Sequence, residues 1–159
     1  MQRAALVIGA FALAAPAVAQ GGGQARWEAE ARGLLAPCAA AAPAIAERVC
    51  AAEQAGFVED YVQALAGSFP ALRNTAYMLA PSVGALPAAD PRRLVRADPV
   101  QGCAWWLVAI GSGDASGTSS DARNARTACD RLPAEEQAMA RARAVRIRGD
   151  IDAARLGGG

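Results

Sequence analysis

The chain has 159 residues, with 16 basic and 15 acidic side chains and no histidine. So small a net charge argues against a nucleic-acid binder or a partner of anionic membranes, because both need a clear basic excess. The lack of histidine removes the commonest general base, the usual serine and cysteine triads and most catalytic zinc sites. We therefore expect a protein that is not an enzyme and that needs no metal or other cofactor.

Residues 1–19 have the pattern of a cleavable secretory signal peptide. A basic residue precedes an uncharged apolar run at 4–15, and Ala17 and Ala19 are the small residues that a signal peptidase requires. A membrane anchor is the alternative, but the run is shorter than the roughly 18 apolar residues that span a bilayer. Every basic residue is arginine and alanine is abundant, as in GC-rich bacterial genomes. Cleavage before Gln20 would deliver a protein without a membrane segment to the periplasm or the medium.

All four cysteines follow the predicted signal peptide, and an even number in an exported protein indicates disulfide bonds. Three pairings are possible. We favour the sequence-local pairing, because each bond would then join neighbouring predicted helices. Metal-binding and thioredoxin-like redox sites are disfavoured, because the sequence contains no C-x-x-C motif. The predicted bonds are Cys38–Cys50 and Cys103–Cys129, each expected to contribute about 3 kcal/mol.

Between its ends the chain is predicted to form one all-α domain. Glycine runs predict a flexible leader at 20–25 and a flexible tail at 157–159. The 26–156 segment between them has the length of one ordinary domain. Apolar residues recur in it at helical spacing, and no stretch shows the alternation of a half-buried strand. We therefore expect about six helices and no sheet.

Three helices are predicted in the first half of the domain, at about 26–36, 43–66 and 68–84. Pro43 suits the first turn of the second helix, because proline lacks only an N–H that would be unpaired there. The apolar residues that recur at helical spacing, and that we expect in the core, are Phe57, Tyr61 and Leu65 in the second helix and Leu72, Ala76, Leu79 and Val83 in the third.

The second half opens with a strong helix start. Asp98 is a good N-cap, Pro99 fills the first helical position, and the Gln101 side chain could reach back as in a capping box. The helix that follows is apolar on nearly every side, which predicts burial on several sides. Two further helices are expected to open near residues 119 and 133.

This fourth helix resembles the second helix of the Sel-one-like repeat, a relative of the tetratricopeptide repeat. That family has an aspartate, a small residue, an aromatic pair and a small residue near the helix end, followed by Gly-Asp. The matching positions are Asp98, Gly102, Trp105, Trp106, Ala109, Gly113 and Asp114. Upstream, 76–80 looks like the first helix of such a repeat, and downstream, 121–137 is similar to its closing helices.

The resemblance covers about 70–143 and departs from the family in three respects. The loop at 84–98 is longer than the family's, it lacks the family's Gly-x-Gly-Val turn, and 26–66 contains no second clear copy. The resemblance implies antiparallel helical hairpins stacked as a short α/α repeat. It also implies a repeat core, made of Leu79, Trp105, Trp106, Ala109 and Gly113.

Repeat proteins of this kind bind proteins or peptides in a groove formed mostly by the first helix of each pair. The resemblance therefore suggests Arg73, Asn74 and Tyr77 as candidate contacts. Trp105 and Trp106 could instead form a stacking platform for a ligand. Neighbouring residues on a helix point about 100° apart, so we expect core packing for both.

The charged clusters have structural explanations that we favour. Three arginines in the predicted loop could hold an anion, although a solvated loop is expected: Arg92, Arg93 and Arg96. The arginines between 141 and 148 are expected to pair locally with Asp150 and Asp152, which follow at i,i+4. The adjacent acids at 59–60 and 135–136 point in diverging directions along a helix, unlike the facing pair of a glycosidase.

These observations predict an exported, non-catalytic helical module that binds a protein or peptide partner. The alternative is a small exported inhibitor of a partner enzyme, led by a protruding loop at 84–98. The two differ in what they bind: an adaptor takes an extended peptide along a groove, and an inhibitor forms a tight one-to-one complex. Neither reading specifies the partner.

Overall fold

The structure is a computed structural model that describes residues 20–38, 44–83 and 93–157. Six α-helices lie in these ranges: α1 (Gln20–Gly33), α2 (Ala44–Leu65), α3 (Phe69–Leu79), α4 (Pro99–Gly111), α5 (Ser119–Cys129) and α6 (Ala134–Gly157). Extended pairing within the described ranges is limited to one isolated bridge, so the all-α prediction is confirmed. The predicted signal peptide at 1–19 lies outside the described residues.

Both ends of the domain are more helical than we expected. Residues 20–25 form the first turns of α1 rather than a flexible leader, and α6 continues to Gly157. Glycine is a poor helix former, but a helix that has been nucleated gains one hydrogen bond for each residue added. In α1, Trp27 and Ala31 pack against the core and hold the turns from which the helix extends.

Helix α3 ends earlier than the apolar pattern predicted. Its last residue is Leu79, and Ala80 has the extended values φ −90° and ψ 97°. Ala80 precedes Pro81, whose ring clashes with a helical residue before it, so the chain leaves the helix there. By contrast α4 begins as expected, with the Asp98 side chain accepting a 2.9 Å hydrogen bond from the Gln101 N–H. The Gln101 side-chain oxygen has no hydrogen-bond donor among the described residues, so the capping box is not formed.

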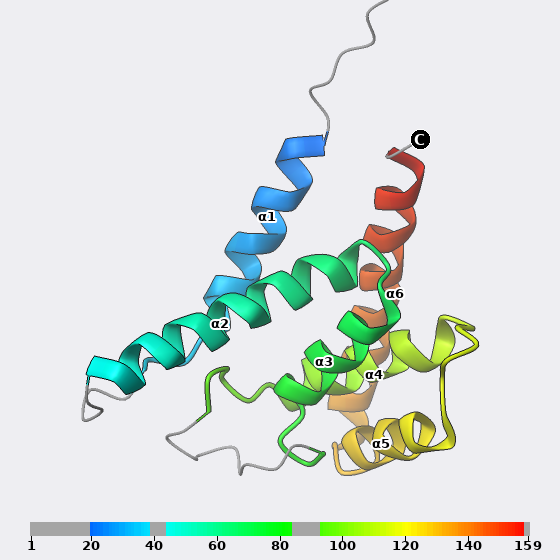
Figure 1. The fold of residues 1–159 in the computed structure, drawn as a ribbon. Coiled ribbons are helices and arrows are strands. Elements are labelled where there is room, and N and C mark those ends of the chain that lie inside the picture. Colours follow the sequence, from blue (N-terminus) through cyan, green and yellow to red (C-terminus); the bar gives the residue numbers. More distant parts are fainter. Residues whose placement is uncertain (1–19, 39–43, 84–92, 158–159) are drawn as a thin grey trace, which may run out of the picture.

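Helix α4 is the centre of the fold, because α3, α5 and α6 all pack against it. The predicted burial on several sides is confirmed: all residues at 101–106 are buried, with Trp105 at 0% and Trp106 at 1% exposure. The ring of Tyr61 from α2 meets Trp105 edge-on at a centroid distance of 5.1 Å. Figure 1 shows α2 crossing from α1 to α3, with α6 running behind α4.

The crossing of α3 and α4 depends on a glycine. A Cβ atom at position 102 would lie 2.7 Å from both the backbone nitrogen and the Cα of Ala80, closer than real Cβ contacts allow. Just before this point, the Asp98 N–H donates to the Leu79 carbonyl at 3.1 Å. Where the Sel-one-like pattern usually has alanine, this chain therefore needs Gly102 for the two helices to approach.

Two disulfide bonds link neighbouring parts of the chain, and they are the pairs that we predicted. Cys38–Cys50 joins the segment after α1 to α2, with a Cα–Cα distance of 6.0 Å. Cys103–Cys129 joins α4 to α5, with a Cα–Cα distance of 5.0 Å. Both bonds fit a protein of an oxidising compartment.

The segment before α4 is tied to the end of α1. Leu35 and Val95 form an antiparallel bridge, and the Gln54 amide donates to the carbonyls of Ala36 and Leu94 at 2.6 and 3.1 Å. Of the three loop arginines, Arg93 donates to the carbonyls of Met78 and Val95, and Arg96 to that of Gly33. Arg92 lies outside the described residues. Arg93 and Arg96 therefore hold the fold together, which corrects the expectation of a solvated loop.

Candidate functional site

The three candidate binding residues on α3 differ in whether their side chains already contact other helices. The Arg73 Nε lies 2.8 Å from an Asp121 carboxylate oxygen, and its guanidinium is 5.9 Å from the centre of the Phe69 ring. Asn74 donates a 3.2 Å hydrogen bond to Asp60 on α2. Tyr77 is 42% exposed. Arg73 and Asn74 thus join α3 to its neighbours, and none of the three lines either hollow described below.

Asp121, the ion-pair partner of Arg73, is a buried and hydrogen-bonded carboxylate. Its side chain is 2% exposed and accepts hydrogen bonds from the Thr118 N–H at 2.7 Å and the Thr118 hydroxyl at 2.8 Å. Burial alone would raise the pKa of Asp121, but the Thr118 hydrogen bonds and the Arg73 guanidinium outweigh it, and the pKa is lowered. Asp121 is therefore an ionised group that caps α5 and ties it to α3.

A second polar cluster joins α1 to α6. Arg26 pairs with Asp150 at 2.8 Å, and Arg143 pairs with Glu30 at 3.3 Å. The buried Tyr61 hydroxyl lies beside this cluster; burial, together with its hydrogen bond to Glu30, raises the Tyr61 pKa well above its usual value. Since Asp150 binds Arg26, the predicted local pairing of Asp150 on α6 is wrong. The cluster is a structural clamp.

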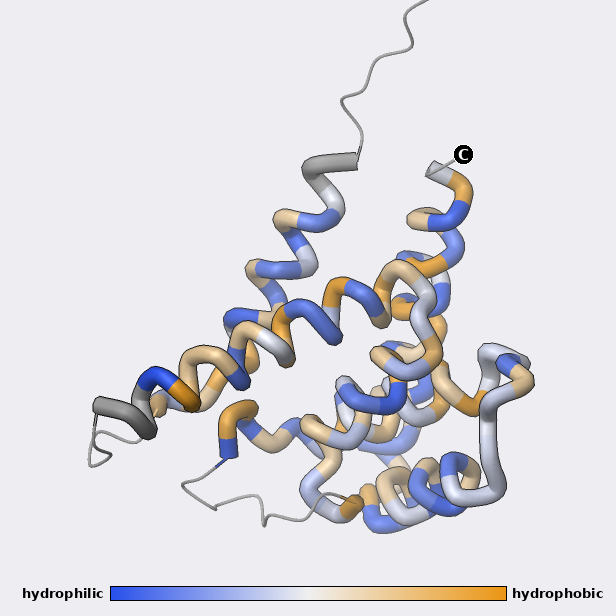
Figure 2. The backbone as a smooth tube through the Cα atoms, in the orientation of Figure 1, coloured by the Kyte–Doolittle hydropathy of each residue, from blue (hydrophilic) through white to orange (hydrophobic). Residues whose placement is uncertain are grey.

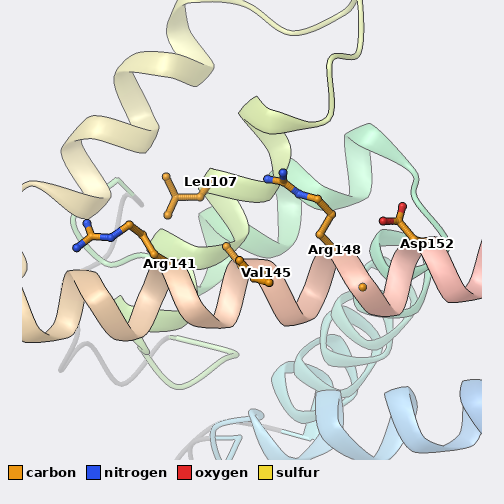
Figure 3. A pocket seen from close by; sticks show the side chains of 7 residues that line it. Leu107, Arg141, Val145, Arg148 and Asp152 are labelled. Carbon is orange, nitrogen blue, oxygen red and sulfur yellow. The ribbon is translucent and has the colours of Figure 1, made fainter.

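A hollow lies where α6 runs along α4. It has a volume of about 570 Å³. Figure 3 shows Leu107 of α4 and Val145 of α6 between the side chains of Arg141 and Arg148, with Asp152 further along α6. Val145 is 71% exposed, the largest value for an apolar side chain in this hollow. We call this hollow the α4/α6 groove; it is lined by Leu107, Arg141, Ala144, Val145, Arg148, Gly149 and Asp152.

A smaller hollow of about 200 Å³ continues from the groove and shares Arg148 and Asp152 with it. Arg148 lies over the end of α4, where a Cβ at Gly111 would be 2.7 Å from its guanidinium nitrogen. Arg155 lies in the same way over Gly67, in the turn after α2. Both arginines are therefore placed at the negative ends of helix dipoles, which favour a positive charge.

The charge along these hollows is positive. Arg141, Arg148 and Arg155 form no ion pair with any described residue, and Asp152 is the one acidic side chain among the lining residues. The lining includes the apolar side chains of Leu107 and Val145. Such a surface can hold an apolar side chain of a ligand while pairing with acidic groups beside it.

Nothing in the described ranges adds a metal centre or a membrane segment. The described residues contain no group of three or more cysteine, aspartate or glutamate side chains placed to hold a metal ion. None of the helices described is both long enough and apolar enough to cross a bilayer.

The spacing of residues in the sequence could have predicted one wall of the groove. Arg141, Val145, Arg148 and Asp152 recur at i, i+4, i+7 and i+11, which places them on one face of α6. We interpreted these charges as local pairs, and the helix that forms the other wall could not be known from this spacing. The suggested repeat core is placed as follows: Leu79, Trp105, Trp106 and Ala109 are buried, and Gly113 is exposed in a turn with φ +71°.

Comparison of the chain with protein-family models, with curated proteins and with solved structures found no match. The resemblance to the Sel-one-like repeat therefore stays a prediction that depends on the residues quoted above. The groove between α4 and α6 is defined by the geometry of this chain alone.

Proposed function

We propose that this chain is an exported, non-catalytic interaction module that binds a protein or peptide partner in the α4/α6 groove. The observation that carries the proposal is the exposed Val145 between two arginines that form no ion pair with any described residue. An exposed apolar side chain in a hollow flanked by charged groups offers a partner the apolar centre and polar rim of which protein interfaces are built.

The rigidity of its walls supports the groove as a binding site. Its walls are α6 and the central helix α4, which pack along each other, and α4 is covalently joined to α5 through Cys103–Cys129. A preformed surface loses little conformational entropy on binding, so more of the contact energy remains as affinity. The helical-repeat resemblance supports the same class of function.

Export to the periplasm or the medium is part of the proposal. It is supported by the signal-like pattern of 1–19 and by the two disulfide bonds, which persist in oxidising compartments. The inhibitor alternative has less support. Residues 84–92 of its loop lie outside the described residues, and the described part at 93–98 is hydrogen-bonded to the rest of the fold.

Site-specific crosslinking tests the proposed function. A photo-crosslinking amino acid placed at Val145 should capture one partner in the cells that make the protein. Met139 is the matched control, because it is 55% exposed on the same helix but does not line either hollow. The captured protein, once purified, should bind the mature chain, and Val145→Asp should weaken that binding at least about tenfold, the loss of about 1.4 kcal/mol. Equal capture from both positions, or binding unaffected by Val145→Asp, would contradict the proposal.

A further inference from the structure

We propose that the α4/α6 groove binds an acidic amphipathic helix of a partner protein. The inference rests on the proposed function and commits it to one kind of ligand. Three features of the groove carry it: the spacing of its arginines, the apolar side chains beside them, and the lack of free backbone groups in its walls.

The arginines are regularly spaced. Arg141, Arg148 and Arg155 stand seven residues apart on α6 and all line the two connected hollows. Two turns of helix separate each from the next, so the positive stripe extends over about 21 Å. A helix lying alongside α6 would present glutamates at the same seven-residue spacing, as paired helices do in coiled coils. The one acidic residue in the lining, Asp152, leaves the stripe with a net positive charge.

Apolar side chains accompany this stripe. Leu107 and Val145 lie in the larger hollow, where Leu107 is half-buried and Val145 is exposed, whereas Leu72, Val108 and Ile151 behind the smaller hollow are buried. A helical ligand with leucines at i, i+3 or i+4 and i+7 would place one apolar face against Leu107 and Val145. Its glutamates, on the flanks of that face, would then reach the arginines.

The backbone of the groove favours a helix over an extended ligand. The walls of the groove are helices α4 and α6, whose internal N–H and carbonyl groups bond within their own helix. An extended peptide would find no strand edge there to satisfy its own backbone groups. A helix satisfies these groups itself and needs only side-chain contacts.

Designed peptides test the inference with the disulfide-bonded mature chain. The probe is a 21-residue amphipathic helix with leucines on one face and three glutamates at seven-residue spacing. Two controls replace the glutamates by glutamine or by lysine, and a third contains a central proline that breaks the helix. By fluorescence anisotropy the glutamate helix should bind about tenfold tighter than the glutamine helix, and tighter still than the lysine helix. Its affinity should fall with rising salt, and the proline should abolish binding.

Charge reversal in the groove sharpens the test. The double variant Arg141→Glu, Arg148→Glu should bind the lysine helix more tightly than the glutamate helix, an inversion that partial unfolding cannot produce. Arg146→Glu is the matched control, because Arg146 is exposed on the same helix and lines neither hollow. It should keep the wild-type preference for the glutamate helix.

The outcomes separate this inference from the proposed function. Equal binding of the glutamate and lysine helices, undiminished binding of the proline peptide, or no binding of the glutamate helix would each overturn the inference. If the crosslinker at Val145 still captures a partner that binds through the groove, the proposed function stands and the acidic helix is excluded. If that capture fails as well, both the inference and the proposed function are contradicted.

Discussion

The surroundings of α4 and the attachment of α1 are stabilised in different ways. Around α4, Trp105, Trp106 and their neighbours are buried against three other helices. In α1, Ala31 alone is buried among the side chains described, and Figure 2 shows that most of this helix is hydrophilic. Besides the packing of Trp27 and Ala31, it is attached by a bridge, two interhelical ion pairs and the nearby disulfide.

This difference indicates that the two regions unfold locally at different free-energy costs. Burial of large apolar side chains is the main stabilising contribution in a folded domain, whereas exposed ion pairs contribute little. We therefore expect the part around α4 to unfold only with the whole domain and α1 to open first. The α4/α6 groove belongs to the stable part.

The largest expected effect is the loss of a tryptophan from the centre of the stable part. Trp105→Ala should lower the free energy of unfolding by about 3–5 kcal/mol, because it leaves a cavity between α4 and Tyr61. Chemical denaturation followed by circular dichroism measures this loss. Ile110→Ala is the control, since Ile110 is on the same helix but 45% exposed. A similar loss in both variants would show that α4 is not the centre of stability.

Removal of each disulfide compares the two regions directly. The bonds span 26 residues in Cys103–Cys129 and 12 in Cys38–Cys50. Loop entropy predicts losses of about 3.5 and about 3 kcal/mol for the respective double serine variants. Hydrogen exchange should distinguish them: without Cys38–Cys50 the amides of α1 lose protection and those of α4 keep theirs, whereas without Cys103–Cys129 protection falls in α4 and α5. Identical exchange patterns would contradict the division.

Local signals in the sequence were sufficient to predict much of the fold. Asp98 and Pro99 defined the start of α4, because a cap and a proline act on the nearest turn. The cysteine pairing followed from neighbouring helices. The end of α3 was missed although its cause is local, since we extended the apolar stripe past Pro81. Residues that contact each other along a helix or across one turn were thus predictable.

Contacts between distant parts of the chain were not predictable in the same way. Asp150 had a suitable partner four residues away, but it binds Arg26, 124 residues earlier. The groove also depends on a contact between distant parts of the chain. The arginine-lined face of α6 meets Leu107 only because α6 packs along α4. Spacing identifies a face of a helix, and the tertiary fold decides what that face meets.

Asp121 tests a polar contact inside the stable part. Asp121→Asn should cost about 2 kcal/mol, because it removes the charge that Arg73 faces and weakens the bonds from Thr118. Since its folded pKa is lowered, this carboxylate contributes stability above its unfolded pKa of about 3.9 and loses it as the pH falls below that value. The difference in stability between wild type and Asp121→Asn should therefore shrink from pH 6 to pH 3. A difference that is constant with pH would rule out the ionised pair; Asp130→Asn, on the exposed end of α5, serves as the control.

The smallest expected effect is on the polar attachment of α1. The Arg26 and Asp150 side chains are 62% and 42% exposed, so Arg26→Ala should cost at most about 0.5 kcal/mol. It should nevertheless raise hydrogen exchange in α1, because the pair bridges α1 and α6, and high salt should mimic it. Arg32→Ala is the control, since Arg32 pairs with Glu28 within α1 itself. Equal exchange in the two variants would mean that the interhelical pair does not hold α1. A loss above 1 kcal/mol would instead show that this polar clamp contributes to the same cooperative unit as α4.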